Sequence, residues 1–295
     1  MPDSMPQSSE PPPELAARRL SALRAELDRL DDQLHDTLMR RAELVAQVGA
    51  LGAKGRVPLR PGREAAIIRR LLARHGGGLS PAAVVRIWRE LLAGTTAQQR
   101  PMLITVCEPE GGPSLLAAAR EHFGALTPVS ARRTPAQAIR DVSSGAATAA
   151  VLPIPAEGEL PSAAWWTALL PQDDPRIHVV ARLPFWAPRP EGAPRGQALV
   201  ISAAPPDPSG QDRSLLGLEV LLETSRARLS TALAAGGLTA GPLILRRDPG
   251  APVAHALADV AGFVADADPR LRALQSVLRP PVVLGAYAIP VGDLG

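Results

Sequence analysis

Six polar side chains within the first hundred residues have the types expected in a binding site for a polyanion. They are Arg24, Arg41, Arg63, Glu64, Thr95 and Gln99. Arginine forks bind carboxylates and phosphates, whereas Glu, Thr and Gln hydrogen-bond to hydroxyl and ether groups. The set holds no nucleophile–base pair and no metal-ligand group. It therefore predicts an enzyme or binder of an anionic small molecule that uses no metal and no cofactor.

Three predicted helices carry these side chains. Residues 15–52 form one long helix, because leucines recur at spacings of 3 and 4 in the manner of a coiled-coil seam. The seam is Leu20, Leu23, Leu27, Leu30, Leu34 and Leu38. A second helix is expected from Pro61, tolerated in a first turn, to His75. Ser80 and Pro81 begin the third, which runs to about Gln99.

The long helix predicts a homodimer. At 1.5 Å per residue it spans roughly 55 Å, too long to bury its leucine seam against one short partner within the chain. Arg24 precedes Arg41 by seventeen residues, roughly 260° around a straight helix, so the two do not easily serve one site. We expect Arg24 to point into the site of the second copy.

Charge and composition exclude several other classes of function. Residues 14–100 hold 16 basic against 9 acidic residues, which suggests an anionic partner. The acidic residues Asp28, Asp31, Asp32 and Asp36 interrupt any continuous basic face, so no nucleic acid is expected. No run of about 18 apolar residues exists, which argues against a membrane span. Residues 1–13 look like a disordered tail without secretory features, and the expected location is cytoplasmic.

Residues 15–100 resemble the all-helical (type II) chorismate mutases, which are intertwined three-helix dimers. The resemblance lies in LSALRAELDRLDDQLHDTLMRRAELVAQVGAL, in RPGREAAIIRRLL and in the segment from Trp88 to Gln99. It implies that Arg24 reaches a substrate carboxylate across the dimer and that Arg41 binds one in its own subunit. It further implies that Arg63 and Glu64 hold chorismate, with Glu64 accepting the ring hydroxyl. Thr95 would be the family's small hydroxyl residue, and Gln99 would donate to the breaking ether oxygen.

The family's usual lysine is missing. It follows the Gly of a Val-Gly motif by three residues, and here that position is Gly52. Lys54 or Arg60 is the candidate replacement for the cation near the ether oxygen. The rearrangement of chorismate to prephenate is pericyclic, so the enzyme need only hold a compact conformer and stabilise charge on the ether oxygen. The other arginines are expected to be solvated surface charges: Arg18, Arg19, Arg69, Arg70 and Arg74.

The remaining residues resemble a truncated prephenate dehydratase followed by an ACT-like regulatory domain. Residues 101–205 show a βαβ rhythm, and the family's Thr-Arg-Phe is replaced by Gly196, Gln197 and Ala198. The sequence has no counterpart to the family's second lobe, so we expect no dehydratase activity. Residues 210–295 alternate as βαββαβ, with the second helix expected over residues 268–278, which suggests a ferredoxin-like unit. They end in a Leu-Gly-x-Tyr similar to the family's.

The sequence thus predicts a multidomain α + α/β protein in three parts. Residues 14–100 form a three-helix chorismate mutase dimerising domain, 101–205 a single dehydratase-like lobe, and 210–295 an ACT-like domain. The predicted function is that of an isomerase that rearranges chorismate to prephenate in aromatic amino acid biosynthesis. Two alternatives stay open: a bifunctional mutase–dehydratase, and a non-catalytic dimer that binds or senses a metabolite.

Overall fold

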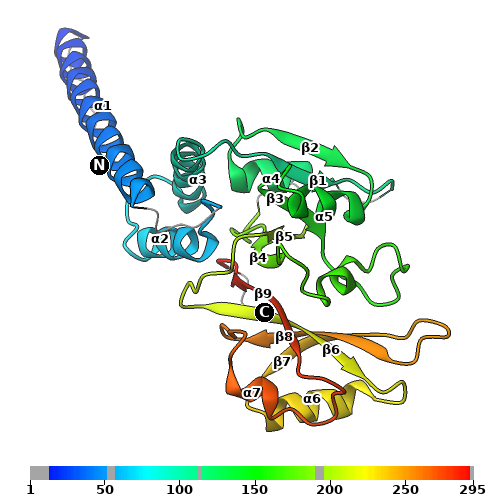
Figure 1. The fold of residues 1–295 in the computed structure, drawn as a ribbon. Helices are drawn as coiled ribbons and strands as arrows, with labels where there is room; N and C mark the ends of the chain where they lie inside the picture. The colour runs from blue at the N-terminus through cyan, green and yellow to red at the C-terminus, as the bar shows by residue number, and fades with distance from the viewer. Residues whose placement is uncertain (1–12, 52–56, 112–113, 190–195, 293–295) are drawn as a thin grey trace, which may run out of the picture. The chain divides into compact units, whose positions relative to one another are not determined.

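The computed structural model describes residues 13–51, 57–111, 114–189 and 196–292. The chain divides into two units, residues 1–53 and 54–295, and each is described by itself. Almost all of the predicted tail, residues 1–12, lies outside the described residues, as do Gly52 and Lys54. The architecture is an N-terminal helical region followed by a large mixed α/β sheet (Figure 1).

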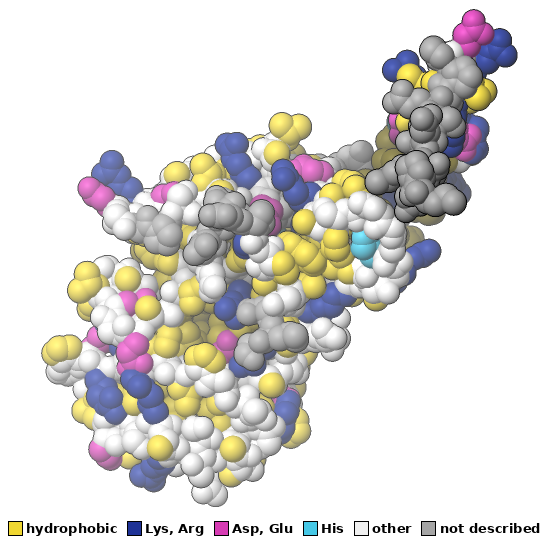
Figure 2. Space-filling model, turned by 180° about the vertical axis from the view of Figure 1, so that it is seen from behind, with side chains coloured by type: hydrophobic (Ala, Val, Ile, Leu, Met, Phe, Trp, Pro, Cys, Tyr) yellow, Lys and Arg dark blue, Asp and Glu magenta, His cyan; other side chains and the backbone are white. Residues whose placement is uncertain are grey.

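The first unit contains one helix, α1 (Pro13–Ala50), of 38 residues. Its bounds agree with the predicted 15–52 to within two residues. Five leucines of the predicted seam, at positions 20, 23, 27, 30 and 34, are 47–59% exposed. Figure 2 shows apolar side chains at the surface of this helix, among charged ones. Charged side chains pair along the helix; for example, Nε of Arg29 donates to Oε2 of Glu26 at 2.9 Å. Helix α1 by itself therefore leaves its leucine seam uncovered.

The second unit begins with α2 (Pro61–Ala73) and α3 (Pro81–Ala97). Both start at the prolines that the sequence indicated. Ser80 caps α3, since its side chain accepts the backbone N–H of Ala83 at 3.2 Å. An apolar cluster packs the two helices against residues from the α/β part: Ala65, Ile68, Val85, Leu92, Phe185 and Ala288. Helices α2 and α3 are therefore built into the same compact unit as the sheet.

Nine strands form one continuous sheet in the order β2-β1-β3-β5-β4-β9-β6-β8-β7. The strands of the first half are β1 (Ile104–Cys107), β2 (Val129–Arg132), β3 (Ala149–Pro153), β4 (His178–Leu183) and β5 (Ala198–Ser202). Those of the second half are β6 (Asp212–Val220), β7 (Ala240–Arg246), β8 (Ala254–Ala261) and β9 (Val282–Ala288). Parallel pairing of β1 with β2 and β3 confirms the βαβ rhythm. Strand β2, an edge strand, was not predicted.

Helices cover both faces of the first half of the sheet. Alternation along β1 sends Ile104 and Val106 to the face under α4 (Leu116–Phe123). Cys107 faces the opposite side, where α5 (Pro135–Ser143) and the 3-10 helix η1 (Trp165–Leu169) pack. Two apolar cores result, one on each side of the sheet, and β1 and β5 are buried along their whole length.

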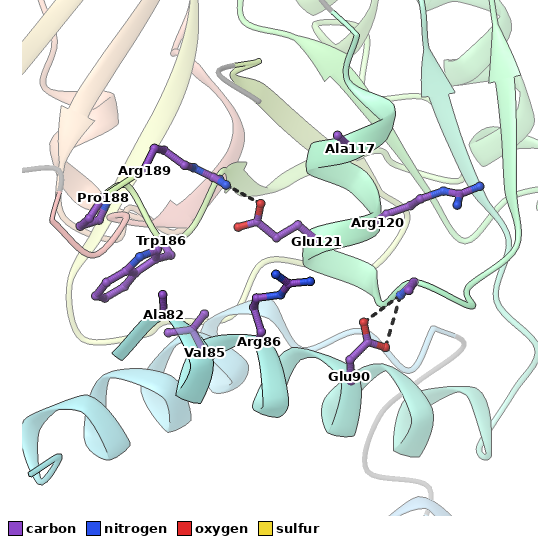
Figure 3. Close-up of a pocket in the computed structure, with 11 residues that line it drawn as sticks. Ala82, Val85, Arg86, Glu90, Ala117, Arg120, Glu121, Trp186, Pro188 and Arg189 are labelled. Atoms are coloured by element: carbon purple, nitrogen blue, oxygen red, sulfur yellow. Dashed lines mark hydrogen bonds and ion pairs between the residues drawn. The ribbon is translucent and has the colours of Figure 1, made fainter. Parts of the chain in front are cut away.

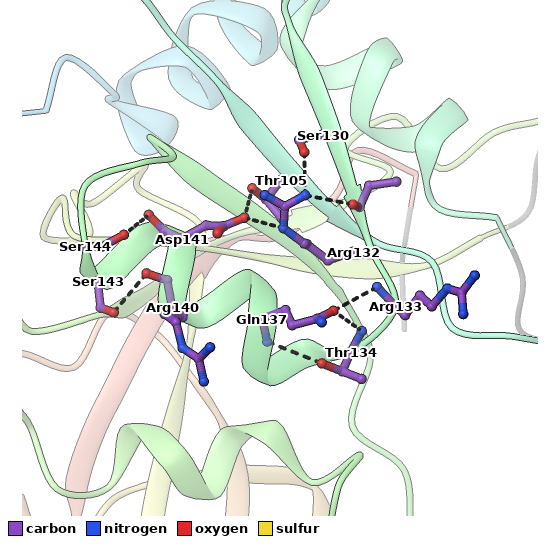
Figure 4. Close-up of polar contacts among 11 residues, drawn as sticks. Thr105, Ser130, Arg132, Arg133, Thr134, Gln137, Arg140, Asp141, Ser143 and Ser144 are labelled. Atoms are coloured by element: carbon purple, nitrogen blue, oxygen red, sulfur yellow. Dashed lines mark hydrogen bonds and ion pairs between the residues drawn. The ribbon is translucent and has the colours of Figure 1, made fainter.

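A polar cluster around the buried Thr105 fixes α5 to β1 and β2 (Figure 4). Thr105, fully buried on β1, donates its hydroxyl to Asp141 of α5 at 3.0 Å, and Nε of Arg132 on β2 lies 2.8 Å from the same carboxylate oxygen. A capping box between Thr134 and Gln137 begins the helix. Every member of this cluster has a partner, so its role is structural.

The second half of the sheet carries α6 (Arg226–Ala235) and α7 (Pro269–Arg272), which pack on one face through a third core. Helix α7 is much shorter than the predicted 268–278. The chain leaves the helix because the N–H of Leu278 donates to the carbonyl of Glu219 on β6 at 2.9 Å, and Ser276 has a φ of 65°. This hydrogen bond to β6 thus takes the place of about two further turns of helix.

The two halves of the sheet meet where β4 runs parallel to β9, with Val179 opposite Gly285. Gly285 has a φ of 141°, and a Cβ atom on it would lie 2.0 Å from the carbonyl oxygen of Val179. Only glycine fits this close approach of two backbones. The glycine of the Leu-Gly-x-Tyr stretch is therefore required by the junction between the two halves.

Candidate functional site

Helix α2 is anchored at its first turn by a residue far along the chain. The backbone N–H groups of Gly62 and Arg63 each donate to the Asp207 carboxylate, both at 3.0 Å. A carboxylate at a helix N-terminus satisfies open donors and favours the helix dipole. Gly62 allows the approach, because a Cβ there would lie 2.0 Å from the carbonyl oxygen of Asp207. The position of the Arg63–Glu64 pair is thus set by the loop before β6.

Arg69 also ties α2 to that loop, and its prediction as a solvated surface charge is wrong. Its guanidinium donates to the hydroxyl of Ser209 at 2.8 Å and to the carbonyls of Gln211 and Ile289. It also lies over the ring of Phe185, 5.6 Å from the centroid. Burial lowers its pKa, an effect that the nearby Asp212 carboxylate opposes. Sequence spacing could not reveal these acceptors, which lie at least 140 residues away.

Glu64, a predicted catalytic residue, forms an ion pair with a residue that the sequence analysis did not select. Nη1 of Arg89 on α3 donates to Oε2 of Glu64 at 3.0 Å. The Arg89 side chain is only 4% exposed and that of Glu64 only 16%. A charge-assisted hydrogen bond between two shielded groups holds both side chains in place. The Glu64 side chain is therefore held by a residue of α3.

Arg89 is enclosed by side chains from the α/β part. Its guanidinium lies over the ring of Phe185, 5.0 Å from the centroid, in cation–π geometry. Burial lowers the pKa of Arg89, and the carboxylates of Glu64 and Glu121 oppose that effect. His122 is buried as well, and burial together with the charge of Arg89 holds its pKa well below 6.5. The positive charge of the Arg89 guanidinium thus contributes to the low pKa of His122.

The other predicted residues of the second unit lie near the ends of α2 and α3. Arg60 precedes α2 as its N-cap residue, and the Arg63 side chain is exposed. Thr95 is buried, and its hydroxyl donates to the carbonyls of Leu91 (2.8 Å) and Leu92 (3.2 Å). Gln99 lies in the turn after α3, where its side-chain amide donates to the carbonyl of Thr95 at 3.2 Å. The structure thus links Glu64 with α3, and Thr95 with Gln99.

Arg24 and Arg41 lie on α1, in the other unit. Their convergence with Glu64, Thr95 and Gln99 stays a prediction, as do the roles assigned to all of these residues. Lys54 lies outside the described residues, and so does Gly52.

A separate cavity of about 380 Å³ lies between α3, α4 and residues 186–189 (Figure 3). None of the predicted site residues lines it. Both carboxylates at its wall are engaged: Glu90 accepts the N–H of Ala125 at 2.9 Å, and Glu121 forms an ion pair with Arg189. Figure 3 shows Arg86 rising from α3 into the space below Glu121. The cavity matters here because Glu121 belongs both to its wall and to the surroundings of Arg89.

Metal and membrane chemistry have no structural signal in the parts of the chain that the structure describes. No group of three or more His, Cys, Asp or Glu side chains there could hold a metal ion. No helix among those residues is both long enough and apolar enough to cross a bilayer.

Comparison with known protein families addresses the helical segment directly. Residues 23–100 match the family described as chorismate mutase type II. These residues carry a type II chorismate mutase domain. The match includes all eight residues proposed for the site: Arg24, Arg41, Lys54, Arg60, Arg63, Glu64, Thr95 and Gln99.

A curated relative extends the likeness beyond the mutase domain. A bifunctional chorismate mutase/prephenate dehydratase from Pseudomonas aeruginosa is 29% identical over 142 residues, which is 46% of this chain. The match spans only 39% of that relative's length.

Two solved structures resemble the chain more distantly. A prephenate dehydratase from Arthrobacter aurescens in complex with L-Phe is 15% identical, with a TM-score of 0.46 over 63% of this chain and 90% of that one. GqqA, described as a novel type of quorum quenching acylase, is 22% identical, with a TM-score of 0.45 over 63% and 94%. At these scores neither likeness supports a statement about activity.

Proposed function

We propose that the protein is a chorismate mutase that rearranges chorismate to prephenate. The observation that carries the proposal is the family match over residues 23–100, which contains every residue selected for the site. In the reaction the ether C–O bond breaks as a new C–C bond forms within one molecule, so no proton donor, metal or cofactor is needed. Catalysis rests on holding a compact conformer and on stabilising negative charge at the ether oxygen.

The proposed roles follow the resemblance. Arg41 binds a substrate carboxylate within its own subunit, and Arg24 binds one across the dimer. Glu64 accepts the ring hydroxyl beside Arg63, Gln99 donates to the ether oxygen, and Thr95 supplies a small hydroxyl. Lys54 or Arg60 provides the cation that the family usually places at the position of Gly52.

The test is to incubate the purified chain with chorismate, to follow the loss of its ultraviolet absorbance and to identify the product. Accumulation of prephenate would support the proposal, and Arg41→Ala should then abolish turnover. Arg40→Ala is the matched control, since Arg40 neighbours it on α1 and pairs with Glu43 instead, at 2.9 Å. No consumption of chorismate by a folded dimer would favour a metabolite-binding protein. A large gain in rate on Gly52→Lys would support a mutase ancestry, because this substitution restores the lysine that the family usually has at that position.

We further propose that α1 forms a homodimer through its leucine seam. The exposed seam residues of this 38-residue helix support the proposal, because such a stripe is costly to leave in water. Leu27→Gln is expected to lower both dimer content, measured by sedimentation, and mutase activity. Asp32→Gln, on the opposite side of the helix, is the control. A monomer with full activity would exclude the shared site.

The sheet region is proposed to be a dehydratase-like lobe, residues 101–205, followed by an ACT-like domain, residues 210–295. The element order β6-α6-β7-β8-α7-β9 supports the ACT-like assignment. The bifunctional alternative has one observation in its favour, the name of the curated relative. The replacement of Thr-Arg-Phe by Gly196, Gln197 and Ala198 argues against it. Phenylpyruvate as the product, in place of prephenate, would establish the bifunctional enzyme.

A further inference from the structure

The mutase domain contains a buried arginine that none of the site assignments uses. Arg89 is 4% exposed, and it donates to Oε2 of Glu64 at 3.0 Å. A buried guanidinium is costly unless it is paired, so a charge at this position of α3 needs a reason. Its neighbours one turn away on the same face, Val85 and Leu92, belong to the apolar cluster between the helices and the sheet.

We propose that Arg89 is a positioning residue for the mutase reaction, which it serves by holding the Glu64 carboxylate in one orientation. The proposal rests on the proposed function, in which Glu64 contacts the substrate. Glu64 lies in the first turn of α2, and a carboxylate side chain at that place has several rotamers within reach. The contact with Arg89 selects one of them.

Arg89 is itself held by the α/β part of the chain. The Phe185 ring, just after β4, lies 5.0 Å from its guanidinium carbon. The charged and titratable groups that face it are Glu64 and Arg69 from α2, with Arg69 over the same ring, and Glu121 and His122 from α4. Glu121 in turn pairs with Arg189 at the wall of the cavity in Figure 3. A mutase residue is thus positioned by residues outside the matched segment 23–100.

The experiment measures kcat and KM of Arg89→Gln and Arg89→Lys in the full chain. Arg89→Gln should lower kcat about 10- to 100-fold with a smaller change in KM, as expected for a misplaced catalytic group. Arg89→Lys keeps the charge but shortens the reach, so kcat should fall about tenfold.

Arg86→Gln is the matched control, since this exposed arginine lies three residues earlier on α3 and should leave kcat and KM unchanged. In a Glu64→Gln background, Arg89→Gln should have no further effect on kcat, because Arg89 acts through Glu64. Phe185→Leu should lower kcat in the same direction by a smaller factor.

Two failures are distinguishable. A wild-type chain that does not convert chorismate overturns the proposed function and this inference with it. An active wild type together with an unchanged kcat in a folded Arg89→Gln variant overturns the role of Arg89 alone. If Arg89→Gln does not fold, Arg89→Lys decides, because wild-type kcat in that variant contradicts positional control.

Discussion

Gly285→Ala tests whether the two halves of the sheet meet as closely as the structure indicates. Two costs add at this position. A φ of 141° is strained for any L-residue, at about 1–3 kcal/mol. The new Cβ would also lie 2.0 Å from the oxygen and 2.5 Å from the nitrogen of Val179, both backbone atoms that cannot rotate away. Separating the strands sacrifices their hydrogen bonding at about 1–3 kcal/mol for each buried group left unpaired. We expect a total loss of about 2–6 kcal/mol.

Gly145→Ala is the control that separates strain from close approach. Gly145 follows α5 with a φ of 77°, and nothing lies within 4 Å of the position that a Cβ would take. Its substitution should cost only the conformational term, about 1–2 kcal/mol. Urea unfolding followed by tryptophan fluorescence reports on the sheet, because Trp165 and Trp166 are buried in its core. Equal losses in the two variants would refute the contact between β4 and β9 as described.

Three further predictions concern the helix anchor, the histidines and the cysteine. Asp207→Ala should destabilise the chain by about 1–2 kcal/mol in urea unfolding, because two N–H groups of α2 lose their acceptor. The control Asp173→Ala, in an exposed loop, should cost less than about 0.5 kcal/mol. Burial, aided by Arg89, holds the pKa of His122 well below 6.5, and burial, aided by Arg176, lowers that of His178 to about 4. Both therefore stay neutral in the folded chain while the unfolded chain takes up protons, so stability present above pH 6.5 should fall toward pH 4, and His178→Gln should flatten that slope. Burial raises the pKa of the Cys107 thiol to about 11, so native protein should resist a thiol reagent that labels urea-unfolded protein stoichiometrically; rapid native labelling would contradict the burial.

Local patterns in the sequence were sufficient for most helices and central strands. The leucine seam predicted α1, and prolines 61 and 81 marked the starts of α2 and α3. Strand β2 was missed because it is an edge strand of only four residues, none of them buried, too short to give a clear apolar pattern. Helix α7 was predicted too long because the carbonyl of Glu219 competes for the backbone N–H of Leu278, a contact between distant parts of the chain.

The site was less predictable, because the residues that hold its side chains and helices in place do so through long-range contacts. Asp207 lies 145 residues from Gly62, and nothing near it in the sequence marks it as a helix cap. Arg89 left a readable signal. It falls four residues after Val85 and three before Leu92, on the apolar face of α3, where a lone charge indicates a buried partner. The pattern could suggest that a partner exists, but it could not identify that partner as Glu64.

The anchors of α2 bear on how the mutase domain works. Asp207 fixes its first turn, and Arg69 binds carbonyls of Gln211 and Ile289, so residues of the sheet region hold the helix at two levels. Arg89 adds a third link, because it binds Glu64 while lying against Phe185. A helix held at three points along two turns has little freedom to rotate about its axis or to slide. The sheet region therefore contributes to the precision with which Arg63 and Glu64 are presented.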